Sequence, residues 1–338
     1  MNKACDKNVA SFFYICLQIS HFFTKIIAMK FIISILILMT MSTLFGEQQR
    51  DSRVSDIGAK LVLNKAYNGD AESMLSVALS YAQCKKGFPK DFSEAIKWFS
   101  RSAELGNAYA QNFLASAYSK GEGVPQDKKL AFEWWSRASE LGYPEAMYNL
   151  AICYSKGTGT KLNYKEAVKW WQKSADCGHA SAQFNIAALY LNGSYLKKSV
   201  KDGMLWLQRS ADGGNADAKT ALAGFYYHGQ GVPQNKAEAC RLWTEAAEQG
   251  VLFAQRNVAI MYLKGDGVKA DKKKFFRYTS MASEQGDVDS LYNMGVIYEV
   301  GDGVERNLDT ALDYYKCALE KGHPNASKKI KMIEQAKK

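Results

Sequence analysis

The sequence is poor in the residues from which metal centres and catalytic sites are usually built. It contains four histidines in 338 residues, and none has a partner at the spacing of a metal-binding pair such as His-x-x-x-His. The segment GTGTK at 157–161 lacks the full spacing of a phosphate-binding loop and the strand that normally precedes one. We therefore expect no metal ion, no cofactor and no catalytic residue.

Cysteine is too irregular to form a repeating disulfide framework. Five cysteines lie beyond residue 46, and no pair of them recurs along the chain: Cys84, Cys153, Cys177, Cys240 and Cys317. Cys153 and Cys177 end two successive predicted helices. These helices run antiparallel and are about 20 Å long, so the two thiols lie at opposite ends of the pair and we expect no disulfide bond between them. Single thiols argue somewhat against an extracellular or periplasmic address.

Basic charge is not concentrated in the body of the chain, although the net charge is +10. Residues 1–46 carry +3 and the residues from His323 onward carry +4, which leaves +3 for residues 47–322. A nucleic-acid-binding protein normally shows a basic stripe. We therefore expect no nucleic-acid partner.

The apolar run Phe31–Phe45 is too short to be a membrane span. It has 15 residues, against about 20 for a transmembrane helix, and it follows Met29-Lys30. A short basic end before an apolar core is typical of a secretory signal, with cleavage expected near Ser42 or Gly46. We predict that residues 1–46 are a leader whose true start is Met29, and that the protein is secreted or periplasmic. If the leader is not cleaved, it would anchor the protein to a membrane.

A 36-residue period runs through the rest of the chain. Seven units extend from Asp70 to Gly322, with one extra residue in the first of them. Tyrosine marks the period at Tyr118, Tyr154, Tyr190, Tyr226, Tyr262 and Tyr298. A period of 20–50 residues indicates stacked supersecondary units.

The first half of each unit has the pattern of a helix. When Asn107 is counted as position one of its unit, small residues recur at position four and aliphatic residues or methionine at position eight, a spacing that marks one helix face. A glycine that would end this helix follows at Gly121, Gly157, Gly193, Gly229, Gly265 and Gly301.

A second helix is predicted to begin at a residue that can cap its free amides. The seven residues at this place all have short polar side chains: Asp91, Asp127, Asn163, Ser199, Asn235, Asp271 and Asn307. We expect the buried stripe of this helix to include Trp98, Trp134, Trp170 and Trp206.

The combined pattern A-x-x-x-L-[AG]-x-x-Y-x-x-G-x-G-V, followed by A-x-x-W and A-x-x-G, resembles the Sel-1-like repeat, a relative of the tetratricopeptide repeat. The resemblance covers residues 70–322 and implies an all-α fold, a right-handed α/α superhelical solenoid of seven repeats. We expect capping helices in residues 47–69 and 323–338, the latter with a basic tail. In the fourth unit Tyr195 replaces the second loop glycine, and we expect that loop to differ in conformation.

The resemblance also implies a non-catalytic scaffold that binds a protein or an extended peptide along a concave face built from the first helices. The candidate residues occupy positions six and seven: Tyr148, Asn149, Phe184, Asn185, Arg256, Asn257, Tyr292 and Asn293. Two interpretations of the asparagines stay open, because they could hold a partner's backbone or bond the neighbouring helix as staples between repeats. We expect the protein to be a monomer.

A second hypothesis is a secreted β-lactam-binding protein or β-lactamase, since some secreted relatives have been described in those terms. Its only support in the sequence is a Ser-x-x-Lys pattern at Ser194 and Lys197, within the loop of the fourth unit. No Ser-Asp-Asn or Lys-Thr-Gly motif accompanies it. A two-residue pattern of this kind is expected by chance in a chain rich in serine and lysine.

Overall fold

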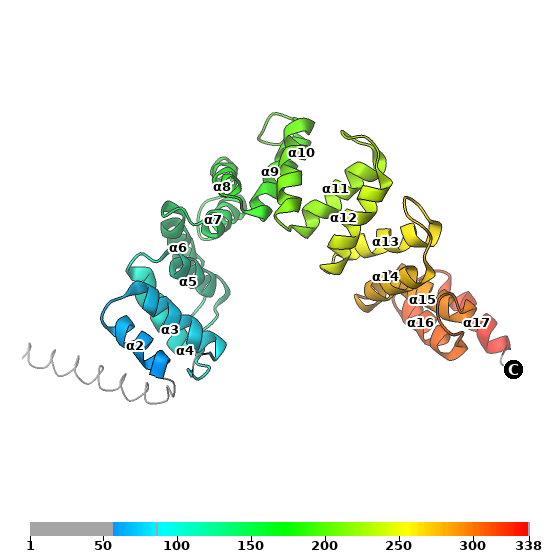
Figure 1. The fold of residues 1–338 in the computed structure, drawn as a ribbon, viewed down its shortest axis with the longest axis horizontal. Coiled ribbons are helices and arrows are strands. Elements are labelled where there is room, and N and C mark those ends of the chain that lie inside the picture. The colour runs from blue at the N-terminus through cyan, green and yellow to red at the C-terminus, as the bar shows by residue number, and fades with distance from the viewer. Residues whose placement is uncertain (1–56, 86, 337–338) are drawn as a thin grey trace, which may run out of the picture. The chain divides into compact units, whose positions relative to one another are not determined.

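The computed structural model describes residues 57–85 and 87–336. Within these residues there are 16 helices and no strand (Figure 1). They fall into two compact units, whose boundary in the sequence lies between Ser102 and Ala103. The helices are α2 (Ile57–Tyr67), α3 (Ala71–Gln83), α4 (Phe92–Glu104), α5 (Ala108–Lys120), α6 (Lys128–Glu140), α7 (Pro144–Lys156), α8 (Tyr164–Asp176), α9 (Ala180–Asn192), α10 (Val200–Asp212), α11 (Ala216–His228), α12 (Lys236–Glu248), α13 (Leu252–Lys264), α14 (Lys272–Glu284), α15 (Val288–Val300), α16 (Leu308–Glu320) and α17 (Ala326–Ala336).

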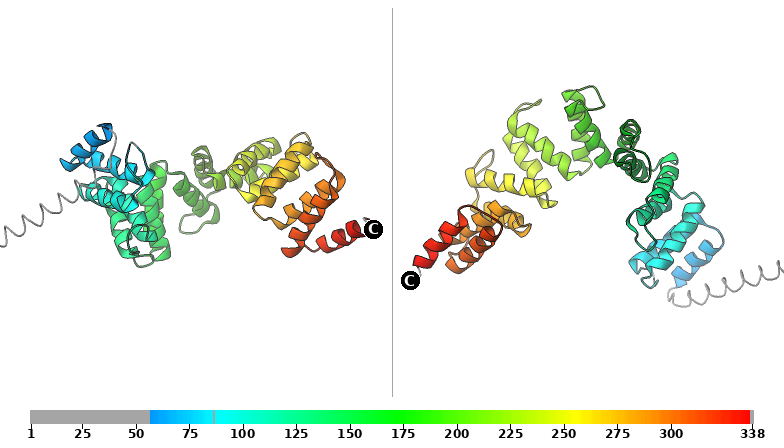
Figure 2. Two further views of the ribbon diagram at one scale, coloured as in Figure 1. Left: turned by 90° about the horizontal axis from the view of Figure 1, so that it is seen from below. Right: turned by 180° about the vertical axis from the view of Figure 1, so that it is seen from behind.

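The predicted all-α solenoid of helix pairs is confirmed. In the unit that begins at Ala103, each first helix packs against the second helix of its own repeat, and from α7 onward each first helix also packs against the second helix of the preceding repeat. The pairs α11–α12 and α15–α16 can be followed from two further sides in Figure 2. The helix α2 precedes the first repeat and packs on α3, whereas α17 follows the last and packs on α16. The leader predicted for residues 1–46 lies outside the described residues.

The local signals in the sequence set the helix boundaries as predicted. All seven predicted caps accept a hydrogen bond from an amide in the first turn of the second helix. The six glycines predicted to end the first helices are all left-handed. In each of these six repeats the amide of the second-helix cap also donates to the carbonyl of the position-twelve tyrosine, as Asn163 does to Tyr154 at 2.8 Å. This bond closes the loop between the two helices and explains why the two positions stay in register.

The core is built from small and branched residues where the first helix meets its neighbours. The position-four residues of these repeats are buried, and so are the residues at position eight. Small side chains at position four allow the backbones to approach, and the larger residue at position eight fills the space beside them.

The buried aromatic stripe of the second helix differs from the prediction. Trp98 and Trp134 are buried, whereas Trp170 and Trp206 are only half-buried. The next position, twenty-nine, is buried in every repeat: Phe99, Trp135, Trp171, Leu207, Trp243, Thr279 and Tyr315. The four tryptophans at position twenty-eight instead lie under a cation from one helical turn later, such as the Lys173 ammonium 4.1 Å from the ring centre of Trp170.

The prediction that the loop of the fourth repeat differs in backbone conformation is wrong. Tyr195 has φ of +62°, the left-handed conformation that glycine has at this place in the third repeat, at Gly159. Its ring stacks on that of Tyr164, with centroids 4.8 Å apart and planes inclined by 3°. This ring contact offsets part of the cost of the left-handed conformation in a residue with a side chain.

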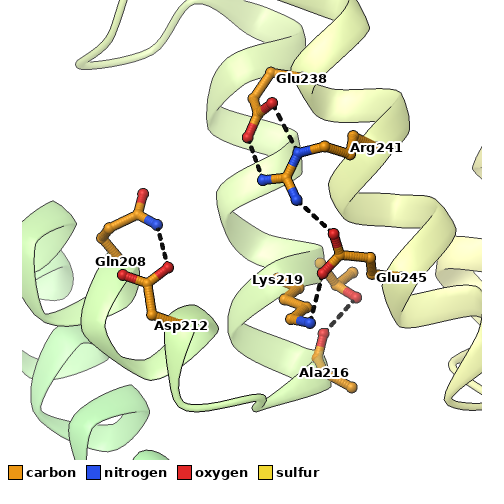
Figure 3. Close-up of polar contacts among 8 residues, drawn as sticks. Gln208, Asp212, Ala216, Lys219, Glu238, Arg241 and Glu245 are labelled. Carbon is orange, nitrogen blue, oxygen red and sulfur yellow. Dashed lines mark hydrogen bonds and ion pairs between the residues drawn. The ribbon is translucent and has the colours of Figure 1, made fainter.

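Charged side chains add a bridge between the two helices of the fifth repeat. Figure 3 shows Arg241 of α12 between Glu238 and Glu245, with Lys219 of α11 reaching the same Glu245 at 2.6 Å. The hydrogen bond from Lys219 holds the pKa of Glu245 below its usual value, and the bond from Arg241 does the same for Glu238. Because Glu245 receives both cations, it links the two helices as one network.

The five cysteines among the described residues are free thiols. Cys153 and Cys240 are buried, and the other three are exposed. Burial raises the pKa of the Cys153 thiol to about 11, so this thiol stays protonated at neutral pH.

Candidate binding face

The eight predicted site residues lie on the first helices α7, α9, α13 and α15. We call the surface formed by positions three, six, seven, ten and thirteen of the first helices the first-helix face. Arg256 and Asn293 are exposed on it, and the other six residues are half-buried. The face is therefore only partly open, and each position has to be judged from its own contacts.

In the third, sixth and seventh repeats, the residue at position six contacts the first residue that follows its repeat. The ring of Tyr148 stacks on His179, with centroids 4.7 Å apart, and Tyr292 stacks on His323 at 4.0 Å. In the sixth repeat the same pair is ionic, because Arg256 lies 3.4 Å from Asp287. In these three repeats the partner 31 residues later is aromatic for tyrosine and acidic for arginine. Sequence reasoning missed these pairs, whose only signal in the sequence is a spacing of 31 residues across the boundary between two repeats.

His179 is held at both ring nitrogens. Its Nδ1 accepts the amide N–H of Ala182, which fixes the proton on Nε2, and Nε2 then donates to Glu145 at 2.7 Å. This hydrogen bond keeps the pKa of Glu145 below its usual value. His179 therefore caps α9 and braces Tyr148. Across the described residues, no group of three histidine, cysteine or acidic side chains could hold a metal ion.

The asparagines at position seven bond within the protein in different ways. Asn149 donates to the Oδ1 atom of Asn112 in the preceding repeat at 3.3 Å, and this atom also accepts the indole N–H of Trp135 at 3.0 Å. Asn257 instead donates to the carbonyl of Phe253 in its own helix at 2.9 Å. The staple geometry is thus present for Asn149, whereas Asn257 bonds only its own helix.

Tyr148 and Asn185 form another link between neighbouring first helices. Burial raises the pKa of Tyr148, and the side chain of Asn185 beside its hydroxyl group partly opposes that rise. Together with the bond between Asn149 and Asn112, this pair links side chains of α7 to side chains of α5 and α9. The roles of the eight residues in binding stay predictions.

The Ser-x-x-Lys pattern of the second hypothesis lies on the surface. Ser194 and Lys197 are both exposed in the loop between α9 and α10. Nothing in this loop favours a β-lactam site over an ordinary turn.

A family model for the Sel1 repeat matches seven consecutive segments of the chain: residues 70–107, 108–143, 144–179, 180–215, 216–251, 252–287 and 288–323. The chain belongs to the Sel1 repeat family. Proteins built from Sel1 repeats commonly bind other proteins and act as interaction scaffolds.

Two solved Sel1 structures are similar to this chain. One is c5321, described as a protective antigen of uropathogenic Escherichia coli with the same type of fold, at 30% sequence identity and a TM-score of 0.70. The match covers 81% of this chain but only 59% of the antigen, so the chain spans about three fifths of the antigen's length. The other is a Sel1 repeat protein from Oxalobacter formigenes, at 27% identity and a TM-score of 0.62, with 75% of this chain and all of that protein covered. No curated protein sequence matches the chain.

Within residues 57–85 and 87–336, no helix is both long enough and apolar enough to cross a lipid bilayer.

Proposed function

We propose that this Sel1 protein is a non-catalytic scaffold that holds an extended segment of a partner protein along the first-helix face. The resemblance to other Sel1 proteins supports a binding role, and the surface of the sixth repeat supports its location. The proposal assigns no reaction to the chain.

The observation that carries the proposal is an exposed apolar stripe on α13. Phe253, Ile260 and Leu263 occupy positions three, ten and thirteen of this helix, and they are 60%, 44% and 50% exposed. They lie along one helix face with Arg256, whose guanidinium is also accessible. Contiguous exposed apolar side chains around an arginine are typical of protein-binding surfaces.

We expect a double variant, Tyr148→Ala with Arg256→Ala, to weaken partner capture at least about tenfold, because hot spots favour tyrosine and arginine. Capture would first be measured with the tagged full chain as bait. The affinity of each retained protein would then be measured directly by calorimetry with purified partner.

The matched control changes two exposed residues of second helices, Glu133→Ala with Lys165→Ala. It removes two side chains from α6 and α8 and should leave capture unchanged. If both double variants bind the partner as tightly as the original chain, the first-helix face is not the binding surface.

The asparagine alternative can be decided on the same protein. If Asn185 is a staple, Asn185→Ala lowers the melting temperature and leaves capture intact. If it contacts the partner, capture falls while the melting temperature stays the same.

We also propose that the protein is exported by means of residues 29–46. The basic end and apolar core of this segment support the proposal. We expect the mature chain to begin between Thr43 and Gln48, as judged by N-terminal sequencing of protein made in its own cell. A cytosolic product that keeps residues 1–28 would contradict export.

A further inference from the structure

The sixth repeat has a small residue at a position that is otherwise large. Position twenty-nine is Thr279 in α14, whereas the same position holds an aromatic residue or leucine in the other six repeats. The difference is largest against the repeats that have tryptophan there, namely those of Trp135, Trp171 and Trp243. The side chain at this position is therefore smaller in the sixth repeat than in any other repeat.

In two of those repeats the indole reaches position six of the first helix. The Nε1 atom of Trp135 donates to the side chain of Asn112 at 3.0 Å, and that of Trp243 donates to the carbonyl of Thr220 at 3.2 Å. The ring therefore extends from position twenty-nine to position six. In the sixth repeat these two positions are Thr279 and Arg256.

A cavity of about 300 Å³ lies at this place, and both Thr279 and Arg256 line it. Its apolar lining comes from α13 and α14, in Ala259, Ile260, Leu263 and Phe275. Its polar lining comes from α15 and the residue that follows the last repeat, in Asp289, Ser290, Asn293 and His323. An apolar cavity of about 150 Å³ is enough to hold benzene, so this cavity has room for a larger aromatic ring.

The hydroxyl of Thr279 points to the kind of ligand. Thr279 is 1% exposed, and its Oγ1 atom has no hydrogen-bond partner among the described residues. A buried hydroxyl without a partner destabilises the protein, so a ligand that donates a hydrogen bond to it would be favoured. An indole has one N–H donor on an otherwise apolar ring, and such a ring also packs well against a guanidinium such as that of Arg256.

We propose that this cavity binds the side chain of a tryptophan in the partner segment, in the space that the protein's own indoles fill in the second and fifth repeats. The proposal deepens the scaffold function and rests on it, because the tryptophan is supplied by the segment held along the first-helix face. The exposed side chains of Ile260 and Leu263 then continue from the cavity onto the surface that the same segment would cover.

The test uses N-acetyl-L-tryptophanamide as a probe on the purified full chain, with no partner present. We expect a dissociation constant of about 1–10 mM by ligand-observed NMR, since a fragment of this size gains little affinity from one cavity. Thr279→Trp should weaken binding at least about tenfold, because it fills the cavity with the residue found at this position in three other repeats. The melting temperature of this variant should not fall, because the third repeat accommodates Trp171 beside Ile152, the counterpart of Ile260.

A second variant keeps the test decisive if Thr279→Trp does not fold. Thr279→Val retains the shape and removes the acceptor, so it should weaken binding of the probe about three- to tenfold. The control Thr310→Val, on the second helix of the seventh repeat, should leave binding unchanged.

Three results would overturn the proposal. The first is no binding of the probe to the original chain, the second is equal binding to the Thr279→Trp variant, and the third is equally tight binding of N-acetyl-L-leucinamide. None of these results would contradict the scaffold function, because that function is tested by partner capture. If Tyr148→Ala with Arg256→Ala abolishes capture while Thr279→Trp leaves it intact, the scaffold function stands and the tryptophan pocket does not.

Discussion

Gly159→Ala should destabilise the protein by about 3 kcal/mol or more, well beyond the cost of a left-handed alanine alone. Gly159 has φ of +72°, and a Cβ atom there would lie 2.0 Å from the carbonyl oxygen of Lys128 and 2.7 Å from its carbonyl carbon. Lys128 is the first residue of α6, in the preceding repeat. The new methyl group would therefore displace backbone atoms where two repeats meet, and backbone cannot move aside as a flexible side chain does.

Gly142→Ala is the matched control for this variant. Gly142 also has a positive φ, +84°, but a Cβ atom there would meet no other atom within 4 Å. Alanine at this position has only the conformational cost, about 1–2 kcal/mol. Urea unfolding of the three proteins, followed by circular dichroism, gives the difference. Equal losses of stability would show that the contact between Gly159 and Lys128 contributes nothing.

The Trp135→Ala variant should lose about 3–5 kcal/mol, because it removes a buried ring and leaves a cavity between α5 and α6. It also removes the indole N–H that bonds Asn112, whose Oδ1 atom then keeps only the weaker bond from Asn149. The loss would be measured by urea unfolding and localised by hydrogen exchange, since repeats in a linear array can open separately.

Trp170→Ala is the contrasting variant on the next second helix. This ring is half-buried and has one face under the Lys173 ammonium. Its removal should lower the free energy of unfolding clearly less than the removal of Trp135, because the ring of Trp170 buries less apolar surface in the folded protein. A larger effect at Trp170 than at Trp135 would mean that position twenty-eight, rather than twenty-nine, supports the stack.

The parts of the fold that the sequence predicted correctly depend on neighbouring residues in the chain. A cap such as Asn163 acts on amides within its own turn, and Gly157 ends its helix through its own backbone conformation, so both can be inferred from residue type and spacing. Burial at positions twenty-eight and twenty-nine could not be inferred in this way. Trp170 and Trp171 are adjacent and identical, and only the packing of α8 against its neighbours decides which of them is covered.

The candidate site was predictable as a face but not as a set of contacts. Helical spacing placed Tyr148 and Arg256 on the same side of their helices, and the structure agrees. The partners of these side chains, His179 and Asp287, belong to the start of the following repeat, which no pattern within one unit indicates. The cavity at Thr279 has a signal in the sequence, because the other repeats have an aromatic residue or leucine at this position. Whether the neighbouring helices close that space could only be seen in the structure.

The contact between position six and the next position one sets how this chain can be cut and copied. A segment that runs from Pro144 to His179, or from Leu252 to Asp287, carries both members of its pair, whereas a segment that starts and ends one residue earlier separates them. A segment duplicated or transplanted with the first choice of boundaries would therefore keep its own contact between position six and the following position one. With the second choice, the position-six residue of the inserted segment would contact the first residue of a different repeat, for example an arginine beside a histidine. The array would then be longer, but its new junction would lack a matched pair.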